Sequence, residues 1–206
     1  DFRLSHVKNK NWSNYDNYYN IYKRAYTPWE WLPELIKYAK KNNIIIFSSP
    51  FDETAVDYLE KHKCPIYKIA SPEINHEPLI SKVAKTNKPI FISTGVASLQ
   101  EISSAIKIIK KNGNSKIVLL KCNSSYPAKE ENMNLLNIEY LSKKFNVSTG
   151  LSDHTKSNLS SIVATTLGVT VIEKHISHTK IGKTLDSFFS LNENNMKKFV
   201  TEIRNT

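Results

Sequence analysis

Six short apolar runs, each followed by a segment long enough for a helix, constrain the fold of this chain more than any other feature. A connection of helix length returns the chain to the starting end of a sheet, so successive runs are predicted to pair as parallel strands. They lack regular alternation of apolar and polar residues, which is typical of strands covered on both faces. The strands are predicted at 44–47, 65–69, 89–92, 117–120, from Gly150, and at 171–175, and the helices at 53–61, 77–86, 98–111, 134–145, 157–167 and 192–204. The sequence therefore predicts an α/β fold with a parallel sheet.

Polar residues follow all six predicted strands, and this observation bears on two possible architectures. In an open doubly wound sheet, ligands bind only where the strand order reverses. In a (β/α)₈ TIM barrel, of which this chain would supply about six βα units, every strand end faces one site. No G-x-G-x-x-G segment follows a strand, and all six ends are polar, so the barrel is favoured. The polar residues are Ser49, Lys68, Ser71, Glu73, Ser93, Lys121, Asn123, Ser152, His154, Glu173 and His175.

Two predicted helix starts carry capping signals. Thr27 precedes Pro28 and Glu30, which predicts Thr27 as the N-cap of a helix. Pro33 falls inside that helix, so its first turn is predicted to be separate from the rest or kinked against it. The spacing of Ser98 and Glu101 is that of a capping box. A shorter helix is predicted over 16–26.

Length and composition indicate one cytoplasmic domain. The chain has 206 residues and two cysteines, which argues against a disulfide framework. It has no apolar run long enough for a membrane span, and its N-terminus does not resemble a signal peptide. We expect one partial barrel over 1–206, with a loop and short helix in 1–26 and the barrel units in 27–206. The net charge of +10 comes from dispersed lysines, which argues against nucleic-acid binding and favours attraction of an anionic substrate.

Two histidines end neighbouring strands of the predicted sheet. His154 and His175 each stand near a carboxylate, Asp153 and Glu173 respectively. Adjacent parallel strands bring their carboxyl ends to one rim, where two imidazoles can bind one ion. Neighbouring carboxylates can orient such ligands. The pattern predicts a site for Mn²⁺, Zn²⁺ or Fe²⁺.

A set of hydroxyl groups and a lysine at the strand ends suits an anionic ligand. Lys68 lies in a run that otherwise indicates core, and a buried lysine needs an anionic partner. It could bind a phosphate or carboxylate, or form a Schiff base as Lys121 also could. Glu73 could supply an acid/base carboxylate. The hydroxyl groups belong to Ser49, Ser71, Ser93 and Ser152.

These strand-end motifs, taken in order, resemble those of the sialic acid synthase family. The motifs are FSSPFD from Phe47, YKIASxE from Tyr67, ISTG from Ile92, LLKC from Leu119, GLSDHT from Gly150 and IEKH from Ile172. The resemblance runs from about residue 26 to the last residue. Within the family, 25–31, 121–128 and 186–191 are most similar to the branch that makes pseudaminic acid.

The resemblance implies an activity and a role for each candidate residue. Phosphoenolpyruvate would condense with the open aldehyde form of an acetamido sugar, giving a nine-carbon 2-keto acid and phosphate. His154 and His175 would bind a divalent metal, commonly Mn²⁺, with Mg²⁺, Co²⁺ or Zn²⁺ as alternatives, and the metal would make the aldehyde electrophilic. The remaining implied roles are phosphoenolpyruvate binding by Ser49, Lys68, Ser71, Ser93 and Ser152, sugar binding by Glu73, Tyr126 and Asp186, and catalysis by Lys68, Glu73 and Glu173.

The resemblance also implies that the 206 residues are part of a longer protein. Two further strands would precede them, so the six predicted strands would be strands 3–8, and an antifreeze-like domain would follow. The full-length protein is expected to be a homodimer, and the isolated fragment is expected to be inactive. The alternatives are an N-acetylneuraminate or legionaminic acid synthase, a Schiff-base aldolase, and a non-catalytic truncated barrel or basic binding module.

Overall fold

A curled sheet of five parallel strands, in the order β1-β2-β3-β4-β5, is the centre of the computed structural model, which describes residues 18–179 and 184–206. Each strand therefore lies beside the next one in the sequence, as strands of a (β/α)₈ barrel do. Five of the six predicted strands are confirmed, and residues 1–17 of the loop and short helix predicted over 1–26 lie outside the described residues. The strands are β1 (Tyr67–Ile69), β2 (Ile90–Ser93), β3 (Ile117–Cys122), β4 (Ser148–Asp153) and β5 (Val171–Lys174).

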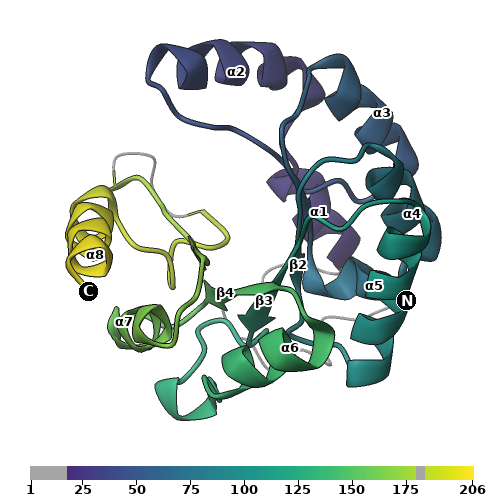
Figure 1. The fold of residues 1–206 in the computed structure, drawn as a ribbon. Helices are drawn as coiled ribbons and strands as arrows, with labels where there is room; N and C mark the ends of the chain where they lie inside the picture. Colours follow the sequence, from purple (N-terminus) through teal and green to yellow (C-terminus); the bar gives the residue numbers. More distant parts are fainter. Residues whose placement is uncertain (1–17, 180–183) are drawn as a thin grey trace.

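The helices form an arc around the sheet, from α2 through α6 to α8, with the strands inside (Figure 1). The arc places α2 to α8 on the outer face of the sheet and leaves α2 and α8 apart. In the described part of the chain, no helix has the length and apolar character needed to cross a lipid bilayer. The helices are α1 (Tyr18–Ala25), α2 (Leu32–Lys41), α3 (Glu53–Lys61), α4 (Glu77–Lys85), α5 (Leu99–Lys111), α6 (Asn137–Phe145), α7 (Leu159–Thr166) and α8 (Glu193–Asn205).

The larger hydrophobic core lies between the first strands and the helices outside them. Ile69, Ile92 and Leu119 are fully buried, and they belong to one cluster with Val83 of α4 and Ile109 of α5. A smaller cluster lies under β4 and joins it to α6 and α7. These strand residues point to the helix side of the sheet. Leu120 of β3 points to the opposite face and is also fully buried, which fits the lack of alternation in the sequence.

One of the two predicted helix caps is confirmed and the other is wrong. The Ser98 hydroxyl accepts from the Glu101 N–H at 3.2 Å, and the Glu101 carboxylate accepts from the Ser98 N–H at 2.8 Å, so the capping box is confirmed. Thr27 is not an N-cap, because the first turn is a separate 3₁₀ helix (Trp29–Trp31) that starts after Pro28. Pro33 lies in the first turn of α2, where the missing N–H is tolerated, and the predicted break is confirmed.

The predicted strand at 44–47 is wrong. In its place is an extended segment whose end makes one isolated parallel bridge, Ser48 to Tyr67, with Lys68 N donating to Ser48 O at 3.4 Å. Ile44 and Ile45 are 62% and 68% exposed. A strand is held by a ladder of hydrogen bonds, and this segment is at the sheet edge beside the three-residue β1, so most of its backbone has no ladder partner.

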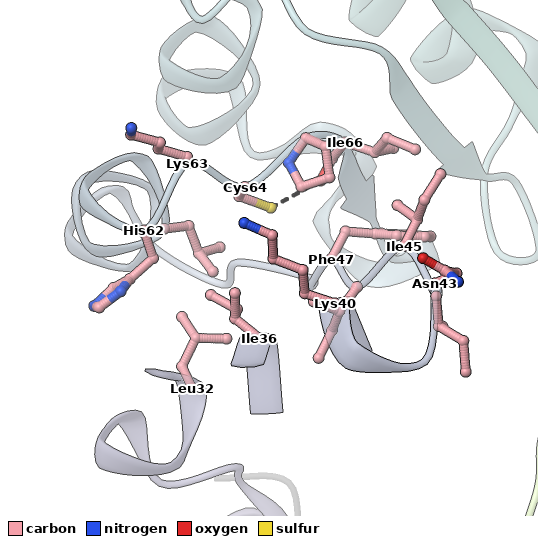
Figure 2. A pocket seen from close by; sticks show the side chains of 14 residues that line it. Leu32, Ile36, Lys40, Asn43, Ile45, Phe47, His62, Lys63, Cys64 and Ile66 are labelled. Atoms are coloured by element: carbon pink, nitrogen blue, oxygen red, sulfur yellow. Dashed lines mark hydrogen bonds between the residues drawn. The ribbon is translucent and has the colours of Figure 1, made fainter. Parts of the chain in front are cut away.

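An apolar groove of about 490 Å³ lies between this edge segment and helices α2 and α3 (Figure 2). Leu32 and Ile36 of α2 form one side, and Phe47, Cys64 and Ile66 lie across from them. The groove holds no cluster of polar strand-end residues, so the candidate chemistry lies elsewhere.

Candidate active site

A second pocket, of about 410 Å³, lies at the carboxyl ends of the strands. It brings together nine of the eleven residues to which the sequence assigned a role in binding or catalysis. The other two, Glu73 and Asp186, are not part of its lining. The lining residues are Ser49, Lys68, Ala70, Ser71, Pro72, Ser93, Cys122, Tyr126, Ser152, His154, Glu173, Lys174 and His175.

A network of polar and charged side chains crosses the floor of this pocket. Ser152 and Glu173 are register partners on β4 and β5, and the Ser152 hydroxyl donates to Glu173 Oε1 at 2.5 Å. Lys68 Nζ lies 3.6 Å from Glu173 Oε2, and the lysine side chain is 9% exposed. The predicted buried lysine thus has an anionic partner, which compensates part of its desolvation.

Three further polar groups lie close to this network of side chains. Ser71 Oγ accepts from the N–H of Gly95 at 3.0 Å, which joins the ends of β1 and β2. The Ser93 hydroxyl is buried and has no hydrogen-bond partner among the described residues. Buried hydroxyl groups are normally hydrogen-bonded, so a free one in a pocket indicates a place for a ligand oxygen. Cys122, which the sequence analysis did not single out, also lines the pocket, and burial raises the pKa of its thiol.

His154 and His175 lie beside each other at the rim, with ring centroids 5.2 Å apart. His154 Nδ1 is 2.7 Å from the carbonyl oxygen of Asn123. A carbonyl oxygen only accepts, so Nδ1 carries the proton and the lone pair is on Nε2. Burial lowers the pKa of His154 and favours the neutral ring. His175 Nδ1 lies 3.5 Å from Asp186 Oδ2, so Asp186 lies against the histidine that ends the neighbouring strand.

The donor chemistry of this histidine pair fits a divalent metal ion. Neutral imidazoles are the ligand form, and each ring has an oxygen partner at Nδ1 of the kind that orients metal ligands. Residues 18–179 and 184–206 contain no group of three or more His, Cys, Asp or Glu side chains placed to hold a metal. Two protein ligands would leave the other coordination positions to water and substrate oxygen.

An aromatic wall, made of Tyr126 and Phe189, encloses the two imidazoles. The Tyr126 ring lies 4.4 Å from the His154 ring, and the Phe189 ring lies 4.7 Å from the His175 ring, measured between centroids. Phe189 is 3% exposed. Its place in the site was not predicted, because the segment after Asp186 reaches the rim only through its pairing with the end of β5, where Leu191 N donates to His175 O at 2.9 Å. Burial raises the pKa of Tyr126.

Lys121 does not enter the pocket. It precedes the pocket residue Cys122 on β3, and neighbouring strand residues point to opposite faces. Its Nζ donates to the backbone carbonyl of Cys122 at 2.8 Å, and burial lowers its pKa. Of the two lysines considered for a Schiff base, only Lys68 lies in the pocket.

Glu73 is half-buried on the 3₁₀ helix Ser71–Asn75 that follows β1. Its Oε2 is buried without a hydrogen-bond partner among the described residues, and burial raises the pKa of the carboxyl group. A buried carboxylate oxygen without a partner costs stability, and such groups are retained at functional positions.

Replacing Glu73 with Gln is therefore expected to stabilise the fold at pH 7. A raised pKa in the folded state means that the wild-type carboxyl contributes most to stability below the unfolded pKa, and that this contribution is lost as the pH rises. The gain of the variant should shrink toward zero as the pH falls to about 4, near the ordinary glutamate value. Urea denaturation at pH 7 and pH 4 measures the difference, and a gain that is absent at pH 7 contradicts the expectation.

Comparison with known proteins identifies relatives of the chain. The family model described as the NeuB family matches residues 3–206. Pseudaminic acid synthase of Helicobacter pylori is 47% identical over 189 residues, which are 92% of this chain and 56% of the relative. N,N'-diacetyllegionaminic acid synthase of Campylobacter jejuni is 42% identical over 173 residues, which are 83% of this chain and 52% of the relative.

A solved structure shows the same fold. The crystal structure of N-acetylneuraminic acid synthetase from Leptospira borgpetersenii superimposes with a TM-score of 0.86 at 32% identity, covering 90% of this chain and 65% of that one. The chain spans about half the length of the curated relatives it matches. The match to the family model and the identity with these relatives show that the chain belongs to the NeuB family.

Proposed function

We propose that this chain is the partial TIM-barrel catalytic domain of a synthase that condenses phosphoenolpyruvate with an acetamido sugar aldehyde to give a nine-carbon 2-keto acid and phosphate. The observation that carries the proposal is one pocket that holds both an anion-binding floor and a histidine pair. Membership of the family adds support. A full-length homodimer in the cytoplasm belongs to the same proposal.

The pocket floor would bind phosphoenolpyruvate. Lys68 supplies a buried positive charge, and Ser93 supplies a hydroxyl group that has no partner among the described residues. Ser49, Ser71 and Ser152 line the same pocket and add further donors. A carboxylate or phosphate gains most from donors held in place before it binds, because little reorganisation is then required. Glu173 is bridged to both Lys68 and Ser152, so it would hold the ammonium group in place until the anion arrives.

The histidine pair would hold a divalent metal ion at the rim. Mn²⁺ is the proposed ion, with Mg²⁺, Co²⁺ and Zn²⁺ as alternatives. When bound, the ion would supply Lewis-acid polarisation of the sugar aldehyde. The chain's own contribution is orientation: Asn123 O fixes the ring of His154, Asp186 lies at Nδ1 of His175, and Phe189 packs against both rings.

Glu73, Tyr126 and Asp186 would bind the sugar. Tyr126 lies in the pocket lining, whereas Asp186 approaches from the segment beside β5 and Glu73 from the 3₁₀ helix after β1. Oε2 of Glu73, which has no partner in the part of the chain that the structure describes, offers an acceptor for a sugar hydroxyl or amide. We propose the sugar of the pseudaminic acid branch, in keeping with the relative from Helicobacter pylori.

The test is phosphate release by the protein that carries this chain. Phosphoenolpyruvate, Mn²⁺ and the acetamido sugar precursors of pseudaminic, legionaminic and N-acetylneuraminic acid are supplied in separate reactions, and mass spectrometry identifies the keto acid. Lys68→Met is expected to lower kcat/KM by roughly 10²-fold or more, because it removes a fixed charge from the anion site. Lys121→Met is the control, since this buried strand lysine lies outside the pocket.

Phosphate release from none of the three sugars, or full activity of Lys68→Met, contradicts the proposal. Borohydride treatment in the presence of a keto acid separates the aldolase alternative, because only a Schiff base on Lys68 would be reduced onto the protein.

A further inference from the structure

A buried ion pair joins β4 and β5 directly behind the histidine pair. Lys174 Nζ lies 2.9 Å from Asp153 Oδ2, and the two side chains are 3% and 0% exposed. The strand register pairs the same two residues. Lys174 contributes to the pocket wall, but its ammonium group is bound on the helix side of the sheet. Ser152 and Glu173 make the corresponding link on the pocket side, so side chains cross-link both faces of the sheet at one level.

The ion pair also holds the loop after β4. Asp153 Oδ1 accepts from the N–H of Thr155 at 2.8 Å, and Oδ2 accepts from the hydroxyl of Ser161 in α7 at 2.6 Å. Lys174 Nζ donates to the carbonyl oxygen of Thr155 at 2.6 Å and to that of Ser157 at 3.1 Å. The residues that follow His154 are therefore bound to the ion pair, and Asp153, the residue that precedes it, is a member of the pair.

Each member of the pair directly precedes one of the histidines. Asp153 is followed by His154, and Lys174 is followed by His175. A buried ion pair contributes little net stability compared with apolar residues of similar size, because desolvation offsets the attraction. It does impose one geometry, since both charges and their hydrogen bonds must be satisfied together. The effect of this pair is therefore expected in the arrangement of the rim more than in the stability of the fold.

We propose that Asp153 and Lys174 are positioning residues, whose ion pair sets the separation and orientation of the His154 and His175 rings. This inference deepens the proposed function and rests on its metal site. With the pair removed, β4 and β5 can shift against each other at the rim, and the loop after β4 loses the hydrogen bonds that Lys174 Nζ donates to Thr155 and Ser157. The His154 ring then no longer holds its Nδ1–H on the Asn123 carbonyl.

The test uses the double variant Asp153→Asn/Lys174→Met, which removes both charges and leaves no unpaired ion buried. The control is Glu60→Gln/Lys88→Met, which removes an ion pair whose side chains are 37% and 25% exposed and which lies outside the pocket lining. Thermal denaturation first establishes that each variant folds. Imidazole ¹⁵N NMR of the metal-free protein then reports the tautomer of His154, and calorimetric titration with Mn²⁺ reports the affinity.

In the double variant, we expect exchange between the Nδ1–H and Nε2–H tautomers of His154. We also expect Mn²⁺ affinity to fall by roughly 10–100-fold, the usual effect of losing an outer partner of a metal ligand. The control should match the wild type in both measurements. An unchanged tautomer or an unchanged affinity in the folded double variant overturns the inference. Should the double variant unfold, the more conservative pair Asp153→Asn/Lys174→Gln, which also leaves no unpaired ion buried, is judged by the same two measurements. If the wild type binds no Mn²⁺, the proposed metal role fails, and the tautomer measurement alone decides the positioning role.

Discussion

Replacing either His154 or His175 with Ala is expected to remove most of the Mn²⁺ affinity and nearly all condensation activity while the fold is retained. The rings are 5.2 Å apart, and the described residues offer no group of three or more metal-binding side chains, so no neighbour replaces a lost imidazole. Loss of an outer partner of a metal ligand costs about 10–100-fold, and loss of a ligand itself should cost more. Calorimetric titration with Mn²⁺ and phosphate release measure the two effects.

His62→Ala provides the control for the histidine variants. His62 caps the C-terminus of α3 and packs against Tyr58, with ring centroids 4.7 Å apart, and it does not line the strand-end pocket. It should leave Mn²⁺ affinity unchanged. Bound Mn²⁺ should also raise the melting temperature of the wild type and of His62→Ala, but not of the rim variants, because a ligand stabilises only a state that binds it. Tight Mn²⁺ binding by the double variant His154→Ala/His175→Ala would exclude the assignment.

Gly150→Ala is expected to lower the free energy of unfolding by about 3 kcal/mol, the upper end of the usual range for overpacking. An added Cβ would lie 2.5 Å from the backbone oxygen of Val171 and 2.6 Å from Leu120 Cδ2. The leucine can change rotamer, but the Val171 oxygen belongs to the neighbouring strand, so β5 must move away from β4. The Ser152–Glu173 and His154–His175 contacts span the same two strands, so Mn²⁺ affinity should fall as well. Urea denaturation and calorimetry measure the two effects.

Gly113→Ala separates this steric effect from the general cost of replacing glycine. Gly113 has a φ of +81°, and an added Cβ there meets no atom within 4 Å. The strain of a left-handed conformation should cost about 1–2 kcal/mol, and Mn²⁺ affinity should not change, because the residue follows α5 away from the rim. Equal losses of stability and equal Mn²⁺ affinities in the two variants would show that the close approach of β4 and β5 at Gly150 is unimportant.

Much of this fold follows from local sequence patterns. Helix α3 begins and ends at the predicted residues, and α5 begins where the Ser98 capping box places its start. These limits depend on hydrogen bonds between residues a few positions apart, so the sequence around them is sufficient. The placement of His154 and His175 on one rim also follows, because successive parallel strands separated by a helix lie side by side with the same polarity.

Contacts between distant segments were not predictable in this way. The run at 44–47 has the composition of a strand, yet it forms no ladder, since pairing depends on neighbours at the sheet edge. Phe189 reaches the imidazoles only because the segment beyond Asp186 pairs next to β5. Lys68 and Lys121 both follow apolar strand residues. Only the face of the sheet to which each side chain points distinguishes Lys68, which lies in the pocket, from Lys121, which lies outside it.

Local patterns of residues are enough to predict the α/β fold, the order of the strands and the polar residues of the rim, because strand and helix periods and capping involve residues close together in the chain. Only the assembled molecule shows which of these residues face each other, how the Lys68–Glu173–Ser152 contacts form, and that Asp153 pairs with Lys174 behind the histidines. Distances between side chains on different strands depend on sheet curvature, register and packing. These properties arise only when all the strands and helices are assembled.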